Sequence, residues 1–120
     1  LNITKSLGVL MATKANLIVD QGSDFTTTID ITDEDDNPVN LTGYTGSGQI
    51  RKTYTSSTAV SFTVSLSGAS GSITLSLTAT QTGNMTAGRY VFDVELTAPT
   101  TGIISRIIEG IVTVTPQVTR

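Results

Sequence analysis

Two carboxylates, Asp93 and Glu95, stand two residues apart in an alternating segment, so a strand would place both on one face. Paired carboxylates are the groups with which glycosidases and other acid–base enzymes move protons. In a sandwich fold, however, Arg51 and Arg106 would lie on the flanking strands with the same outward orientation. Because no nucleophile, separate base or pocket-forming loop accompanies the pair, the sequence favours surface ion pairs over catalysis.

A second acidic segment begins like a calcium-binding loop. Asp33, Asp35 and Asn37 supply oxygen atoms at alternating positions. That loop also needs a glycine at its sixth position and a glutamate at its twelfth, and here Pro38 and Tyr44 stand there. The segment therefore predicts a solvated hairpin tip, and we expect no bound metal.

The composition narrows the class of protein further. The 120 residues include no histidine and no cysteine, which removes the commonest general base, the commonest metal ligands and any disulfide. The net charge is -3 and the seven basic residues are scattered, whereas nucleic-acid binding requires clustered Lys and Arg. No apolar run approaches the ~18 residues of a membrane span. We therefore expect a non-enzymatic protein with no cofactor and with neither nucleic acid nor membrane as a partner.

Strands must position these side chains, because apolar and polar residues alternate over most of the chain. Turn signals separate seven alternating segments, at 15–20, 24–32, 43–52, 60–66, 73–77, 88–97 and 103–115. Residues 78–88 are too few for a stable helix and predict one capped turn that places Met85 in the core. The pattern predicts an all-β protein, a single two-sheet antiparallel β-sandwich of immunoglobulin-like type, with a closed barrel as the alternative.

The sandwich is expected to span residues 15–120 as one domain. Residues 1–14 are expected to form an N-terminal extension, either mobile or introduced by cloning, because Met11 is a natural start. Within the sandwich, we expect Leu75 at the centre of the core. Tyr90 should be buried at the start of its strand, with its hydroxyl group bonded to backbone upstream. The glycines within 43–52 indicate a bulge or a close approach.

The final predicted strand, 103–115, carries apolar residues on both of its faces. Alternate positions form one row of Ile103, Ile107 and Ile111 and another row of Ile104, Ile108 and Val112. Only one row can line the core, so the other needs a cover.

Two covers are available for that outer row. One is the N-terminal extension, through Leu7, Val9 and Leu10, and the other is a partner subunit, which we favour. We therefore take Ile103, Ile107 and Ile111 as an assembly face of a homo-oligomer, with Gly110 as a bulge that exchanges the two rows midway. Ile107→Glu, or Ile108→Glu if the facing of the two rows is reversed, should then leave a soluble folded monomer.

Four segments together resemble a known family. Residues 36–44, 71–75, 88–94 and 109–114 are similar to the small immunoglobulin-like β-sandwich domains of tailed-bacteriophage virion proteins. Such domains occur in upper-baseplate and tail-fibre proteins and as short structural proteins, including those of marine cyanophages. The resemblance extends from Ala15 to Arg120 and consists of turns and core strands, so it carries over no functional residue.

The resemblance implies a non-enzymatic structural protein of a bacteriophage virion, associated with the tail, baseplate or fibre and made in the host cytoplasm. Its expected partners are copies of itself and other virion proteins. The alternative is a carbohydrate-binding or host-surface adhesion module. Such modules present aromatic platforms to sugar rings, and this chain has no tryptophan. Tyr54, beside a predicted loop, is the one ring that the core is not expected to claim.

Overall fold

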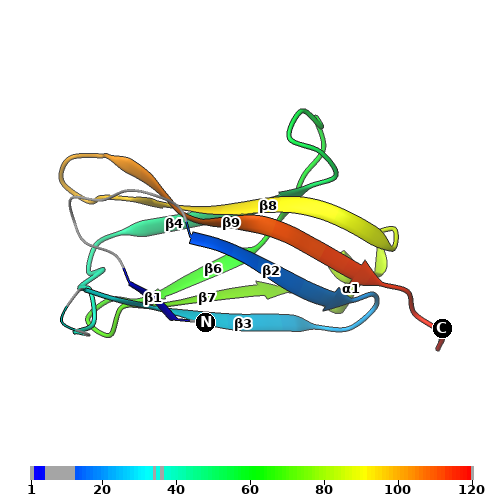
Figure 1. Cartoon of the computed structure of the whole chain (residues 1–120), viewed down its shortest axis with the longest axis horizontal. Helices are drawn as coiled ribbons and strands as arrows, with labels where there is room; N and C mark the ends of the chain where they lie inside the picture. Colours follow the sequence, from blue (N-terminus) through cyan, green and yellow to red (C-terminus); the bar gives the residue numbers. More distant parts are fainter. Residues whose placement is uncertain (1, 5–12, 34, 36, 120) are drawn as a thin grey trace.

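The computed structural model describes residues 2–4, 13–33, 35 and 37–119. In this part of the chain, nine strands form two sheets that face each other (Figure 1). One sheet has the order β1 (Asn2–Thr4), β3 (Phe25–Thr32), β7 (Ser72–Leu77) and β6 (Thr63–Ser67). The other has the order β2 (Thr13–Asp20), β9 (Ile104–Thr115), β8 (Gly88–Thr97), β4 (Thr45–Arg51) and β5 (Val60–Ser61). The predicted all-β sandwich is confirmed.

Most neighbouring strands run antiparallel, as expected, and two pairs do not. β1 pairs with β3 in parallel, and β2 pairs with β9 in parallel. β1 lies inside the predicted extension 1–14, and β2 begins at Thr13, two residues before the predicted domain start. Leu7, Val9 and Leu10, the predicted cover for the outer row, fall outside the described residues. The structure describes no helix long and apolar enough to cross a membrane.

The core lies between the sheets and is built from the inward alternate positions of the strands. Leu75 is fully buried, as predicted. Three aromatic rings meet in the core. The ring of Phe62 lies 6.4 Å from that of Phe25 and 6.1 Å from that of Phe92, within the range of favourable aromatic pairs.

The segment 60–66, predicted as one strand, is divided at Phe62. β5 pairs with β4 in the five-stranded sheet, whereas β6 pairs with β7 in the other. Phe62 stands between them with its side chain buried in the core. An alternating pattern predicts which side chains point inward but cannot show that the chain moves from one sheet to the other, because both strands bury the same face.

The crossing before β8 has the expected capped turn. α1 (Ala79–Gly83) begins after Thr78, whose side chain accepts from the Gln81 amide while the Gln81 side chain accepts from the Thr78 amide. Met85 is buried, as predicted.

The hydroxyl of Tyr90 donates to the Thr86 carbonyl at 2.6 Å, which confirms the predicted bond. The prediction that its ring is buried was wrong, since the ring is only half-buried.

A bulge in β9 changes the predicted facing of the final strand. The β8–β9 register shifts between Val94, which pairs with Ile108, and Glu95, which pairs with Arg106, so Ile107 has no partner. Ile107 and Ile108 are consequently both buried. The prediction that Ile103, Ile107 and Ile111 share one exposed face was therefore wrong at Ile107. Ile107→Glu would place a carboxylate in the core.

Gly110 is not the bulge that the sequence indicated. It stands in regular pairing with Phe92 on β8 and Ala15 on β2. A Cβ atom at this position would collide with the carbonyl oxygen of Ala15. Gly110 is therefore needed for the close approach of two backbones.

Candidate functional site

The candidate site lies on the face of the five-stranded sheet that points away from the core, which we call the outer face. Strand register places Lys14, Glu109, Asp93 and Gln49 side by side in one row across β2, β9, β8 and β4. Glu109 and Asp93 are direct cross-strand neighbours. Two carboxylates in this relation repel each other unless a cation lies between them.

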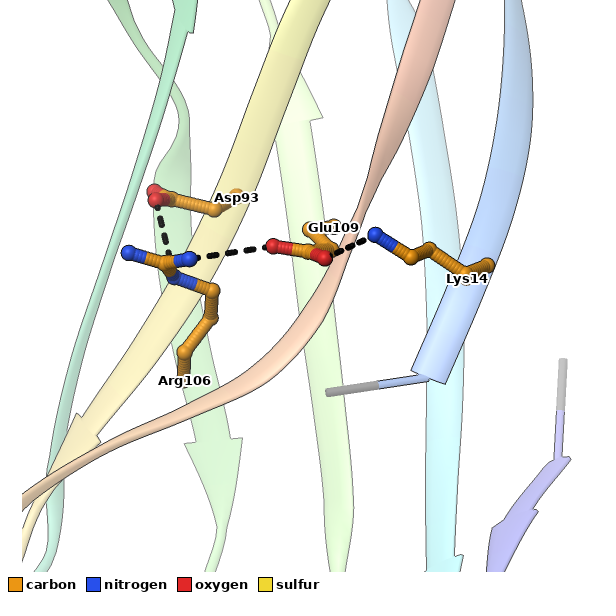
Figure 2. A network of polar contacts seen from close by, with 4 residues as sticks. All are labelled: Lys14, Asp93, Arg106 and Glu109. Atoms are coloured by element: carbon orange, nitrogen blue, oxygen red, sulfur yellow. Dashed lines mark hydrogen bonds and ion pairs between the residues drawn. The ribbon is translucent and has the colours of Figure 1, made fainter. Parts of the chain in front are cut away.

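Arg106 supplies that cation. Its Nε atom lies 3.3 Å from Asp93 Oδ2, and its Nη1 atom lies 3.0 Å from Glu109 Oε2. Lys14 Nζ contacts the other oxygen of Glu109, which completes a chain of ion pairs from β8 through β9 to β2 (Figure 2). We call these four residues the ion-pair network.

The network shifts two protonation equilibria. The hydrogen bond from Lys14, followed by that from Arg106, lowers the pKa of the Glu109 carboxyl below its ordinary value. The hydrogen bond to Glu109, followed by the charge of Asp93, raises the pKa of the Arg106 guanidinium. Both shifts favour the charged forms. Glu109 is therefore held as a carboxylate and is poorly suited to act as a general acid.

The predicted ion pairs are confirmed in part. Arg106 pairs with Asp93, as expected. Arg51 instead donates to the Ser56 carbonyl at 2.6 Å and to Gln49 Oε1 at 3.0 Å. Within the described residues, the Glu95 side chain has no hydrogen bond or ion pair, although its charge acts on Arg106.

Sequence reasoning missed Glu109 and Lys14. The bulge at Ile107 brings Glu109 onto the outer face opposite Asp93, and the parallel pairing of β2 brings Lys14 beside it. No short sequence pattern predicts the bulge at Ile107 or the parallel pairing of β2 with β9.

A hollow of about 470 Å³ opens beside the network. On one side stands the loop of residues 52–59, which rises from the sheet between β4 and β5 (Figure 1). The polar lining of the hollow comprises Ser47, Gln49, Arg51, Asp93, Glu95, Arg106 and Glu109. Tyr54, the predicted ligand contact, also lines the hollow and is 83% exposed.

The remaining predicted site residues lie elsewhere. Ile103 and Ile104 are 55% and 62% exposed and stand where the β8–β9 hairpin turns. Ile111 is 37% exposed on the outer face, diagonal to Ile18 on the neighbouring strand, which is 69% exposed. The structure thus separates the predicted assembly face into a hairpin tip and an outer-face pair.

The acidic segment that begins like a calcium loop forms a turn. Asp33 Oδ1 accepts from the backbone N–H groups of Asp35 at 2.9 Å and Asn37 at 3.0 Å. These bonds use the carboxylate to close the turn. The described residues contain no group of three or more His, Cys, Asp or Glu side chains arranged to hold a metal ion.

The strands, core and outer face define a small two-sheet β-sandwich domain. Among solved structures, it is similar to the N-terminal domain of phage TP901-1 ORF48, with a TM-score of 0.60 over 94% of this chain and 93% of that one. The two sequences are 9% identical, so the similarity shows a shared fold.

A second similarity is weaker. A family 123 glycoside hydrolase from Clostridium perfringens, whose structural analysis concerned glycolipid glycan hydrolysis, gives a TM-score of 0.42 at 13% identity. It covers 89% of this chain and 23% of that one, and the TM-score is too low to define a common fold. No known family profile and no curated protein matches the chain.

Proposed function

We propose that this protein is a non-enzymatic structural component of a bacteriophage virion, associated with the tail, baseplate or fibre. The observation that carries the proposal is the end-to-end match to the phage ORF48 domain, which covers more than nine-tenths of both chains. Because the match covers nearly all of both chains, the two structures are alike as whole domains and not only over a shared fragment. The family resemblance of the turn and core segments supports the same class of protein.

The strand order supports an immunoglobulin-like sandwich. The order β1-β3-β7-β6 faces β2-β9-β8-β4-β5, which corresponds to the ABED and GFC sheets of that fold with the first strand divided between them. The Tyr90 hydroxyl bonded to Thr86 corresponds to the tyrosine corner of such domains. We infer a fold that contacts other proteins through its sheet edges and end loops.

The outer-face carboxylates support a role without catalysis. Asp93 and Glu109 are both ion-paired with Arg106, and Glu109 is also paired with Lys14. A general acid needs a raised pKa so that it carries a proton near neutral pH, whereas the pKa of Glu109 is lowered. The carboxylates of Asp93 and Glu109 are therefore better explained as stabilising the sheet.

For assembly we favour the tip of the β8–β9 hairpin as a contact between copies of this chain. Ile103 and Ile104 are adjacent and exposed there, and the turn is closed by bonds from Ala98 N to Ile103 O at 2.9 Å and from Gly102 N to Ala98 O at 3.2 Å. A preorganised apolar tip loses little conformational entropy when it binds.

Immunogold electron microscopy of purified particles tests the virion role. Antibodies against this chain should label the tail or its end at a regular position. Labelling confined to free protein or cell debris would contradict the proposal.

A further inference from the structure

We propose that the hollow beside the ion-pair network is a binding site for a short neutral saccharide. Its volume, about 470 Å³, falls in the lower half of the ~300–1,000 Å³ range of small-molecule sites. That size suits a mono- or disaccharide. The proposal concerns a ligand and does not depend on the virion role.

The rim of the hollow presents a free aromatic ring. Tyr54 stands on the raised loop with most of its surface exposed. The loop is held in place, because Arg51 Nη1 donates to the Ser56 carbonyl at 2.6 Å and Ser56 N donates to the Thr53 carbonyl at 3.1 Å. A ring presented by an anchored loop can pack against the apolar face of a sugar without a large ordering cost.

The floor offers both hydrogen-bond donors and acceptors that the described residues leave unused. The Glu95 carboxylate and the Ser47 hydroxyl are cross-strand neighbours, and neither has a side-chain partner there. Gln49 accepts from Arg51 through its oxygen, so its amide N–H₂ remains available to donate. Sugar hydroxyls both donate and accept, and a mixed lining of this kind complements them.

The charge of the lining selects a neutral ligand. Three carboxylates (Asp93, Glu95 and Glu109) face two guanidinium groups (Arg51 and Arg106), which leaves an excess of one negative charge. Asp93 and Glu109 are already ion-paired with Arg106. Lys14 also pairs with Glu109 and balances that excess. The charges that remain are the Glu95 carboxylate and the Arg51 guanidinium, which has only neutral hydrogen-bond partners. They are opposite in sign, so the lining favours neither an anion nor a cation.

Heteronuclear NMR of the whole chain, combined with a glycan array, tests the proposal. The soluble probes are cellobiose, lactose and N,N′-diacetylchitobiose, added in the millimolar range, together with any short neutral glycan that the array identifies. We expect at least one probe to shift amide signals of residues 47–54 and 91–95 and to leave those of the four-stranded sheet unchanged.

Two variants and a competing probe show whether the saccharide binds in the hollow and whether the Tyr54 ring contributes. Tyr54→Ala should weaken binding about tenfold by removing the ring contact. Ile18→Ala, which alters an exposed residue of the same sheet outside the hollow, should bind like the native chain. The proposal is overturned if no saccharide on the array or in solution shifts these signals, or if Tyr54→Ala binds unchanged. It is also overturned if only arginine methyl ester shifts them, because the hollow would then accept a cationic protein side chain.

Discussion

At the scale of single residues, the outer face is arranged by charge. Strand pairing sets Asp93 against Glu109, and Arg106 lies between them with contacts to both.

The Tyr90 side chain makes two separate contacts, one through its hydroxyl and one through its ring. Its hydroxyl closes the corner through Thr86, while the Lys52 ammonium lies 4.6 Å from the centre of its ring. These contacts are partly exposed, so each stabilises the fold only modestly.

Tyr90→Phe should reduce the free energy of unfolding by about 0.5–1.5 kcal/mol, because it removes one hydrogen bond and retains the ring that Lys52 covers. Urea denaturation measures the loss. Tyr44→Phe is the control, since the Tyr44 hydroxyl has no hydrogen bond within the described residues, and its stability should match the native chain. An equal loss in both variants would contradict a specific role for the Tyr90 bond.

Glu109 should make stability depend on pH. Its pKa is lowered in the folded chain, so its contribution is fully present above the unfolded value of about 4.3 and is lost as pH falls through the lowered folded pKa. Glu109→Gln should cost up to about 1 kcal/mol at pH 7, and this cost should shrink as the solution is acidified.

Denaturation series at several pH values measure that trend. Glu95→Gln is the matched control, because Glu95 has no ion pair in the described part of the chain, and at pH 7 it should cost less stability than Glu109→Gln. A Glu109→Gln cost that stays constant down to acid pH would show that the ion-pair network does not stabilise the fold.

At the scale of elements, the sequence predicted the alternating strands well and the irregular positions poorly. The inward rows of β3, β7 and β8 follow directly from period-two alternation, as the burial of Leu75 shows. The capped turn at Thr78 was also predictable, since capping depends on residues three apart. Each of these features is local.

The failures share one physical cause. The bulge at Ile107 reverses the facing of the first part of β9, and isoleucine is equally acceptable on either side of it. The change of sheet at Phe62 leaves the apolar pattern intact. Both depend on pairing between strands distant in sequence, and so does the hollow, whose lining is brought together by three strands and a loop.

Gly110→Ala should reduce the free energy of unfolding by about 1–3 kcal/mol, because the added methyl group would collide with the Ala15 backbone and push β2 away from β9. Hydrogen exchange should show the loss of amide protection concentrated in β2. Gly83→Ala is the control, since its nearest neighbour, Gly22 Cα, would lie at an ordinary 3.7 Å. If the two variants are equally stable, β2 does not pack against β9 as described.

At the scale of the whole molecule, the exposed isoleucines of the described residues lie at two separate places. One is the tip of the β8–β9 hairpin, and the other is the outer-face pair of Ile18 and Ile111. The polar hollow lies on the same sheet as the second place. The proposed assembly contact and the proposed saccharide site therefore occupy separate surfaces of the domain.

The double substitution Ile103→Ser and Ile104→Ser should weaken self-association at least tenfold and leave the melting temperature of the dilute protein nearly unchanged, because both side chains are exposed. Light scattering and analytical ultracentrifugation over a concentration series measure the change. Val118→Ser, which changes a side chain that is 90% exposed and lies outside the hairpin tip, is the control and should associate like the native chain. A native chain that stays monomeric at the highest concentration would rule out the tip as a contact between copies.

Quantitative mass spectrometry of purified phage particles tests the central claim most directly. The particles come from the phage or lysogen that carries the gene, and they are followed through successive density-gradient steps. A structural component should remain at a constant molar ratio to the known tail proteins. If its peptides decline towards zero while the tail proteins persist, the chain is not part of the virion.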